Sequence, residues 1–199
     1  MNDFLRYYLP IFYALVLLFA FVIISYRTYK STGINPITFG KEPNAHNYIG
    51  NVMKVLLAAL FVVILMYSFG NIYQFTISIP YLQNLNIHFV GLILIHISLI
   101  WIIIAQVQMS NSWRIGIDEQ NKTDLITKGL FSISRNPIFL GMIICVAGLF
   151  LVIPNAISLC ILVTTYIVIH IQIRLEEEFL KKQHGEQYKS YQSKTRRLL

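Results

Sequence analysis

Polar residues that could do chemistry gather in two segments of an otherwise apolar chain, residues 110–141 and 174–199. In the first segment, Arg135 directly precedes Asn136-Pro137. Asparagine is a favoured N-cap and proline a favoured first helical residue, so we expect a helix to begin at Pro137. A guanidinium beside the free N–H groups of a helix start suits an anion such as a carboxylate or a phosphate. The alternative is an ordinary capped helix whose Arg135 contacts lipid phosphates.

The second segment begins with three consecutive carboxylates, Glu176, Glu177 and Glu178. Glu177 and Lys181 are spaced for an i,i+4 ion pair on a helix, and Gly185 is a typical helix stop. A helix is therefore predicted to continue to about His184. A solvated helix face is one explanation of the acidic run. However, three carboxylates near negative lipid headgroups are easier to retain beside a cation.

The elements that position these residues are predicted to be membrane helices. Of 199 residues, 56% are hydrophobic and 13% charged, about half the usual charge of a soluble domain. This composition excludes a disordered chain. A membrane span needs about 20 apolar residues, and Pro154-Asn155 indicates a turn. We predict an all-α, polytopic integral-membrane helical bundle of about five transmembrane helices with a cytoplasmic C-terminal helix, the spans being Tyr7–Tyr26, Val55–Gly70, Leu85–Met109, Pro137–Ile153 and Ala156–Ile173.

The positions of the basic residues predict how these spans are oriented. Fourteen of the 16 lysines and arginines fall in residues 27–48, 108–135 and 174–199, and residues 71–84 hold none. The positive-inside rule makes the three basic segments cytoplasmic, with the N-terminus outside and the C-terminus in the cytoplasm. Membrane lipids are the expected partners of this charge. Nucleic acid is not, because no recognition motif accompanies the basic residues.

The histidines and cysteines give weaker signals. His88 and His96 lie in one predicted span, where we expect neutral, hydrogen-bonded packing histidines and not metal ligands. Cys145 and Cys160 stand in apolar runs, where we expect small buried residues without a disulfide or a zinc site. Residues 31–48 form a turn-rich loop to which the sequence assigns no role.

A longer ordered pattern resembles the isoprenylcysteine carboxyl methyltransferase family, which is related to phospholipid N-methyltransferases. The pattern is Leu125-x-Thr127-x-Gly129-x-Phe131-x-x-x-Arg135-Asn136-Pro137-x-Phe139-x-Gly141, then a hydrophobic hairpin, then Glu176-Glu177-x-x-Leu180-x-x-x-x-Gly185-x-x-Tyr188-x-x-Tyr191. It covers residues 108–197. We therefore treat residues 1–199 as one membrane domain, with three spans of no specific motif in 1–107 and a methyltransferase-like half in 108–199.

The resemblance implies an integral-membrane methyltransferase that uses S-adenosylmethionine, and the histidines and cysteines predict no metal site. Carried over to this chain, it makes Arg135 and Glu177 catalytic, and it places eight residues around the cofactor: Thr127, Gly129, Arg135, Asn136, Pro137, Glu176, Glu177 and Tyr188. Asn136 departs from the pattern, because many members have histidine there and asparagine cannot titrate near neutral pH. The tail from Thr195 to Leu199 also departs, since it lacks the proline-containing ending of the family.

The expected acceptor is a lipophilic small molecule or lipid with a carboxylate or amine. A carboxylate needs no proton removal, whereas an amine must be neutral, which would require a base such as His184 or a glutamate. Residues 112–116 resemble bacterial members, which implies the bacterial inner membrane. Two other functions stay open. An NADPH-dependent membrane reductase of the steroid-reductase type would need a basic cluster for the 2′-phosphate, and none stands out. A non-enzymatic membrane scaffold or carrier would leave Arg135 and the glutamates unexplained.

Overall fold

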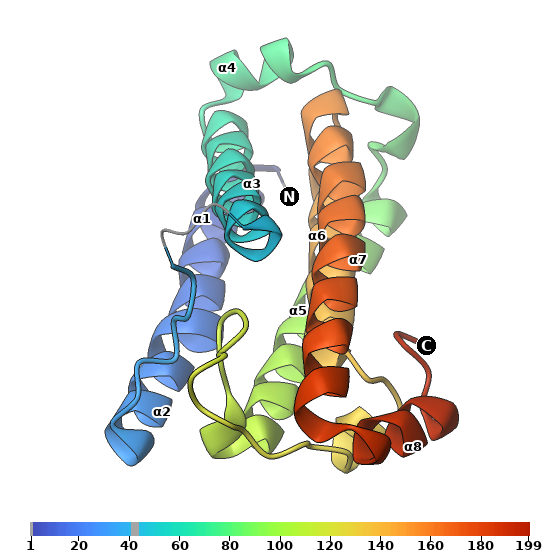
Figure 1. The fold of residues 1–199 in the computed structure, drawn as a ribbon. Coiled ribbons are helices and arrows are strands. Elements are labelled where there is room, and N and C mark those ends of the chain that lie inside the picture. The colour runs from blue at the N-terminus through green and yellow to red at the C-terminus, as the bar shows by residue number, and fades with distance from the viewer. Residues whose placement is uncertain (1, 41–43) are drawn as a thin grey trace.

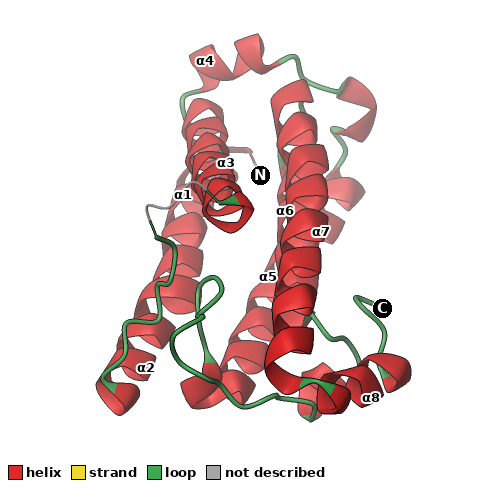
Figure 2. Cartoon of the chain, in the orientation of Figure 1, coloured by secondary structure: helices red, strands yellow, loops and turns green. Residues whose placement is uncertain are grey.

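Long helices run between two ends of the molecule, and the loops gather at those ends (Figures 1 and 2). The computed structural model describes residues 2–40 and 44–199, and within these ranges it holds isolated β-bridges but no sheet. The helices are α1 (Asn2–Leu17), α2 (Ile24–Thr32), α3 (Ala45–Ser68), α4 (Gly70–Tyr73), α5 (Leu85–Met109), α6 (Pro137–Val152), α7 (Ala156–His184) and α8 (Glu186–Lys194). The predicted all-α bundle is thus confirmed.

Four helical segments are long and apolar enough to cross a membrane: Asp3–Thr32, Ala45–Ser68, Leu85–Ser112 and Ala156–His184. The remaining predicted span is α6, whose 16 apolar residues rise only about 24 Å. Because α6 begins beside Arg135 and ends beside Pro154 at the opposite end, the chain runs the length of the bundle five times. Helix α7 has 29 residues and rises about 44 Å. It is therefore longer than the hydrocarbon core of about 30 Å, in agreement with its predicted extension to His184.

The first membrane helix contains a local irregularity. Residues Leu18–Ile23 form a π-helical turn between α1 and α2, and the three pieces make one continuous helix. The side-chain amide of Gln106, on α5, donates a hydrogen bond of 2.7 Å to the carbonyl of Ala20 inside this turn. A π-turn widens the helix and loosens its regular bonding, and such turns are frequent at functional sites.

Glycines allow α5 and α6 to pack closely. A Cβ on Gly148 would lie 2.9 Å from the carbonyl oxygen of Gly91, and one on Gly91 would lie 2.7 Å from the carbonyl of Gly148. The two backbones therefore touch at this crossing. In a membrane, where lipid is as apolar as leucine, such close van der Waals packing is a main source of helix association. The α5–α6 pair is accordingly the most extensive contact between helices.

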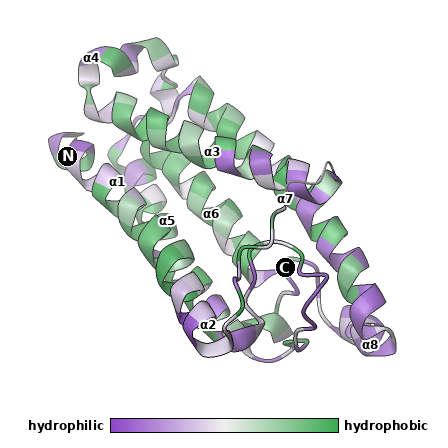
Figure 3. Cartoon of the chain, turned by 60° about the vertical axis from the view of Figure 1, so that its left-hand side comes forward, coloured by the Kyte–Doolittle hydropathy of each residue, from purple (hydrophilic) through white to green (hydrophobic). Residues whose placement is uncertain are grey.

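The turn between α6 and α7 lies where the sequence predicted it. Asn155 is fully buried and accepts a hydrogen bond of 2.8 Å from the backbone N–H of Ser158, while the Ser158 hydroxyl accepts one of 3.1 Å from the N–H of Asn155. This reciprocal pair satisfies donors at the start of α7. Hydrophobic residues cover most of α3, α5 and α6, whereas hydrophilic residues gather around α8 (Figure 3).

The expectations for His88 and Cys160 are wrong, whereas the one for His96 is confirmed. His96 is hydrogen-bonded to the hydroxyl of Tyr8 and to the carbonyl of Leu92. By contrast, both ring nitrogens of His88 are buried without a partner among residues 2–40 and 44–199, because the imidazole lines a cavity. Cys145 is buried, but Cys160 is exposed, since it lies on the outer face of α7 among apolar side chains that would meet lipid.

Helix α2, the connection between α5 and α6 and the end of α7 with α8 lie at one end of the bundle, and residues 71–84 lie at the other (Figure 1). At the basic end, the turn-rich loop that follows α2 packs onto the chain beyond α5. The backbone N–H of Ile115 donates to the carbonyl of Pro36 at 2.7 Å, and the N–H of Thr38 donates to the carbonyl of Ile115 at 3.1 Å. The described part of the loop therefore packs against the chain at Ile115.

Candidate functional site

The carboxylate of Glu177, in the last turns of α7, lies between two arginines. Oε1 of Glu177 is 2.7 Å from Nη2 of Arg135, and Oε2 is 2.7 Å from Nη2 of Arg197. The side chains of Glu177 and Arg135 are 5% and 7% exposed, whereas that of Arg197 is 40% exposed. We call these three residues the arginine–glutamate cluster. Two guanidiniums and one carboxylate leave it with one net positive charge.

The C-terminal tail completes this cluster by docking on the segment before α6. The backbone N–H of Arg135 donates to the carbonyl of Arg196 at 2.9 Å, and the Arg135 guanidinium donates to the carbonyl of Thr195. Asn136 precedes α6 as predicted, but its side chain does not cap the helix. Instead its amide donates to the carbonyl of Arg197 at 2.9 Å, because the tail lies within reach of the amide.

Two tyrosines of α8 lie next to the arginine–glutamate cluster. Tyr188 is 1% exposed, and its ring meets that of Tyr191 edge to face at 6.1 Å. The hydroxyl of Tyr191 donates to the carbonyl of Phe131 at 2.6 Å. Burial and the nearby Glu177 charge raise the pKa of Tyr188 to about 12, although Arg135 acts in the opposite direction. Tyr188 is therefore a neutral, buried support of the cluster.

Glu176 has quite different surroundings from its neighbour. The carboxylate is half-buried and accepts a hydrogen bond of 2.8 Å from the side-chain amide of Gln172, one turn earlier on α7. None of the described residues forms an ion pair with it. The amide nitrogen of Gln172 also lies 3.4 Å from Nδ1 of His46, at the start of α3. Oε1 of Gln172 is buried and finds no partner in residues 2–40 or 44–199. Glu176 is thus a carboxylate that is free to accept from a cation or a hydroxyl.

Thr127 and Gly129 lie in the connection between α5 and α6. Gly129 has φ of +64°, and a Cβ there would lie 2.5 Å from the side-chain nitrogen of Gln108. The same Gln108 accepts a hydrogen bond of 2.9 Å from the N–H of Leu130. Within the described ranges, no hydrogen bond or ion pair joins Thr127 or Gly129 to the glutamates. The close contact of Gly129 with Gln108 therefore fixes the turn, and the turn carries the chain to Arg135.

The predicted i,i+4 pairing of Glu177 with Lys181 is wrong. The Glu177 side chain points toward the start of α6, whereas Lys181 is exposed. The cation that retains this carboxylate is therefore supplied from other parts of the chain.

An apolar cavity of about 80 Å³ lies between α1, α3, α5 and α6. It is bordered by the π-turn and by Ile138 and Met142, in the first turns of α6. Two buried polar atoms of lining residues have no partner within residues 2–40 and 44–199: Nε1 of Trp113, a donor, and Oε1 of Gln106, an acceptor. An apolar space with a few unsatisfied polar groups is typical of a ligand site.

Comparison with known proteins decides between the classes of function. A family model of phospholipid methyltransferases matches residues 86–187. The chain belongs to the phospholipid methyltransferase family. No curated protein matches it significantly. Membership makes the chain a membrane methyltransferase, and it favours neither a reductase nor a scaffold.

The part shared with other phospholipid methyltransferases comprises α5, α6 and α7. It includes Arg135, Asn136, Glu176 and Glu177, but it ends just before Tyr188 and leaves out the tail. Arg197 is the residue that our reading of the sequence missed. The sequence signal was the run of three glutamates after the last span. It predicted a neighbouring cation but did not identify Arg197 as that cation.

Proposed function

We propose that this phospholipid methyltransferase family member binds S-adenosylmethionine at the basic end of the bundle, between Glu176 and the arginine–glutamate cluster. The observation that carries the proposal is the half-buried Glu176, which has an amide partner but no cation among residues 2–40 and 44–199. Methyltransferase chemistry of this kind requires a donor whose sulfonium is cationic and whose amino acid end carries both charges. The polar groups of this end of the molecule match those charges.

The residues present fit the cofactor. Glu176 and the unpartnered Oε1 of Gln172 are acceptors suited to an ammonium or to ribose hydroxyls. The cluster has a net positive charge, and Nη1 of Arg197 forms no hydrogen bond with the described residues. Arg197 could therefore hold a carboxylate while it keeps its contact with Glu177. The polar atoms of Arg135 and Glu177 bond to each other and to the C-terminal tail. We therefore propose that these two residues position Arg197 and the start of α6.

S-adenosylmethionine, when bound, supplies an activated methyl group. The contribution of the chain is to hold the donor and acceptor in line and to exclude water, which can supply much of the rate enhancement. We propose that the acceptor is lipophilic and reaches the apolar cavity beside the π-turn from the membrane. Trp113 Nε1 and Gln106 Oε1 would then orient its polar end.

The acceptor group is a carboxylate, as in the isoprenylcysteine carboxyl methyltransferase-like members, or an amine. A carboxylate reacts without loss of a proton. An amine would require a base, for which Glu176 and His184 are the candidates. We propose the bacterial inner membrane as the location, with the basic end in the cytoplasm, so that cofactor and acceptor arrive from different phases.

The test is cofactor binding by the purified full-length protein. We expect S-adenosylmethionine and its demethylated product to bind by isothermal titration calorimetry, with NADPH unable to compete. The matched variants are Glu176→Gln and Glu178→Gln, because Glu178 is the exposed neighbour. Weaker binding in the first variant alone supports the site. Equal binding in both moves the cofactor elsewhere, and binding of NADPH without S-adenosylmethionine would favour a reductase.

A further inference from the structure

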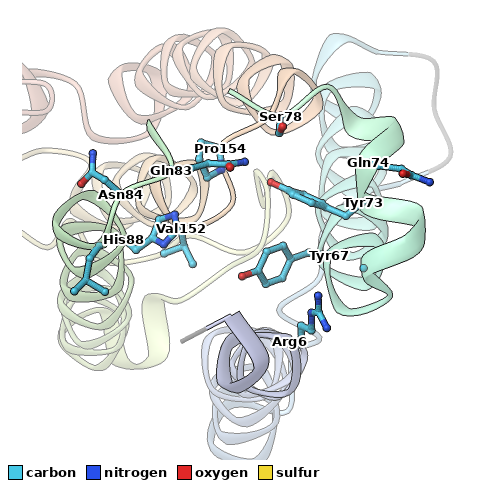
Figure 4. A pocket seen from close by; sticks show the side chains of 12 residues that line it. Arg6, Tyr67, Tyr73, Gln74, Ser78, Gln83, Asn84, His88, Val152 and Pro154 are labelled. Carbon is cyan, nitrogen blue, oxygen red and sulfur yellow. The ribbon is translucent and has the colours of Figure 1, made fainter. Parts of the chain in front are cut away.

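A second cavity of about 480 Å³ lies at the end of the bundle opposite the proposed cofactor site (Figure 4). It is formed where α1 begins, α3 ends, α5 begins and α6 ends. Its volume lies in the range of ordinary small-molecule sites. Six residues supply most of its polar lining: Arg6, Tyr67, Tyr73, Gln83, Asn84 and His88. The methyltransferase family assignment gives this end no role.

Two side chains of this cavity are more than nine-tenths buried and have unused polar atoms. Tyr67 and His88 are each 8% exposed. The hydroxyl of Tyr67 and both ring nitrogens of His88 lack a hydrogen-bond partner throughout residues 2–40 and 44–199. Figure 4 shows the Tyr67 hydroxyl directed into the space between Arg6, Tyr73 and Val152. Buried polar groups are nearly always paired, so these atoms call for water or a ligand in the cavity.

The charge around the cavity is positive. Arg6 packs against the backbone of Gly70, where a Cβ would lie 2.7 Å from Nη2 of the guanidinium. The acidic partner of Arg6 is Asp3, whose carboxylate lies 3.4 Å away and is 91% exposed to the outside. No aspartate or glutamate lines the cavity within the described residues. Helix α5 begins at the cavity with Leu85, whereas α3 and α6 end there, so the helix dipoles offset one another and the positive charge is that of Arg6.

We propose that this cavity binds an anion that carries a phosphate group, held by Arg6, Tyr67 and His88. A guanidinium, a phenolic O–H and an imidazole N–H are all donors, and a phosphate offers several strong acceptor oxygens. A cationic ligand would meet Arg6, and an apolar ligand would leave the buried nitrogens and hydroxyl unpaired. The phosphate can come from a free metabolite or from a lipid headgroup, since the cavity lies at the end of the membrane helices.

The experiment is calorimetric titration of the full-length protein in a phosphate-free detergent. The probes are inorganic phosphate, glycerol 3-phosphate and the short-chain lipid dihexanoylphosphatidylglycerol. Tyr67→Phe removes only the hydroxyl, and Arg6→Gln removes the charge. We expect each variant to weaken binding about tenfold or more, as for loss of a hydrogen bond to a charged group. Tyr81→Phe is the matched control, because Tyr81 is at the same end and 93% exposed.

The pattern of probes identifies the source of the phosphate. Binding of all three indicates recognition of phosphate itself, and binding of the lipid alone indicates a headgroup site. Melting temperature should not fall in Tyr67→Phe, since the hydroxyl has no partner among the described residues. S-adenosylmethionine affinity should be unchanged in both variants, because the two sites lie at opposite ends. If no probe binds, or if both variants bind like the parent protein, the cavity holds water only and the proposal is wrong.

Discussion

Glu176 and Glu177 are adjacent on α7, but among the described residues only Glu177 is paired with cations. Its carboxylate contacts Arg135 and Arg197, whereas Glu176 accepts a hydrogen bond from the amide of Gln172. Successive helical residues point in directions about 100° apart, so the two carboxylates face different neighbours. Glu177 faces the start of α6 and the tail, and Glu176 faces the side of α3. The two glutamates are therefore expected to respond differently to the same substitution.

Glu176→Gln should weaken cofactor binding without loss of stability. The variant keeps the shape and one acceptor of the side chain but removes the charge that no described cation neutralises. Loss of a hydrogen bond to a charged group costs about 1.5–3 kcal/mol, which corresponds to roughly 10- to 150-fold in affinity for S-adenosylmethionine. Calorimetry and thermal melting measure the two effects. Glu178→Gln is the control, and a large drop in melting temperature for Glu176→Gln would contradict this division of roles.

Glu177→Gln should instead destabilise the fold. It leaves the buried Arg135 beside Arg197 without a counter-charge, and breaking a buried pair costs about 3–5 kcal/mol. We expect the lower end of this range, because the half-exposed Arg197 can turn to solvent. The double variant Glu177→Gln/Arg197→Gln should be less unstable than the two single effects added together, since it removes the repulsion. Additive effects in this double-mutant cycle would show that the two residues are not coupled.

Local signals in the sequence predicted the helices well. The Asn136-Pro137 start of α6, the Pro154-Asn155 turn and the extension of α7 to His184 all follow from short-range chemistry that a sequence displays. The long apolar runs predicted the spans for the same reason. The turn at Gly129 is likewise a local feature, because glycine readily adopts the left-handed backbone that is found there, with φ of +64°.

Contacts between segments that are distant in the chain could not be predicted from the sequence. Arg197 meets Glu177 because the tail turns back along the segment before α6, and no periodicity reveals such docking. The ring nitrogens of His88 have no hydrogen-bond partner among the described residues because they line a cavity that several helix ends form together. In the same way, the pairing of Ile115 with Pro36 depends on how the loop after α2 folds over the bundle. Each of these features is set by packing and not by neighbours in the sequence.

Acid should weaken the buried ion pair at the basic end, between Arg114 and Asp118. Burial raises the pKa of the Asp118 carboxyl, but hydrogen bonds from Arg114, Asn121 and Gln120 outweigh burial, so the pKa lies below its usual value. A depressed pKa in the folded state means that the ionised carboxylate stabilises the protein above about pH 4, and that this stability is lost as the pH falls through the folded-state pKa.

The corresponding variant is Asp118→Asn. At pH 7 we expect it to be less stable than the parent protein by about 1–3 kcal/mol, because Arg114 loses its charged partner. The difference in melting temperature should shrink as the pH is lowered below 4. Glu119→Gln, at the exposed neighbouring position, should change neither the stability at pH 7 nor its dependence on pH. A gap between Asp118→Asn and the parent that does not vary with pH would rule out the titration of Asp118 as its cause.

The α5–α6 crossing should be intolerant of any side chain at Gly148. An alanine Cβ there would lie 2.8 Å from Cγ2 of Ile95 and 2.9 Å from the carbonyl oxygen of Gly91, so the helices must separate. Overpacking of this kind costs about 1–3 kcal/mol. Gly148→Ala should therefore lower the melting temperature in detergent by several degrees. Ile97→Ala, on the outer face of α5 where the side chain is 56% exposed, should have little effect. Equal melting temperatures of the two variants would show that close contact between α5 and α6 does not stabilise the protein.

The basic end of the bundle should face the cytoplasm. Helix α2 and the basic residues of 108–135 and 174–199 lie at the end that holds α8, and residues 71–84, which have no lysine or arginine, lie at the other end. The test begins from a protein in which Cys145 and Cys160 are replaced by alanine. Single cysteines are then introduced as Tyr81→Cys and Lys189→Cys, whose parent side chains are 93% and 63% exposed. A membrane-impermeant maleimide added to intact cells should label the first and not the second, and permeabilised cells should show both. Labelling of Lys189→Cys alone in intact cells would reverse the orientation, and it would place the proposed cofactor site outside, where S-adenosylmethionine is not made.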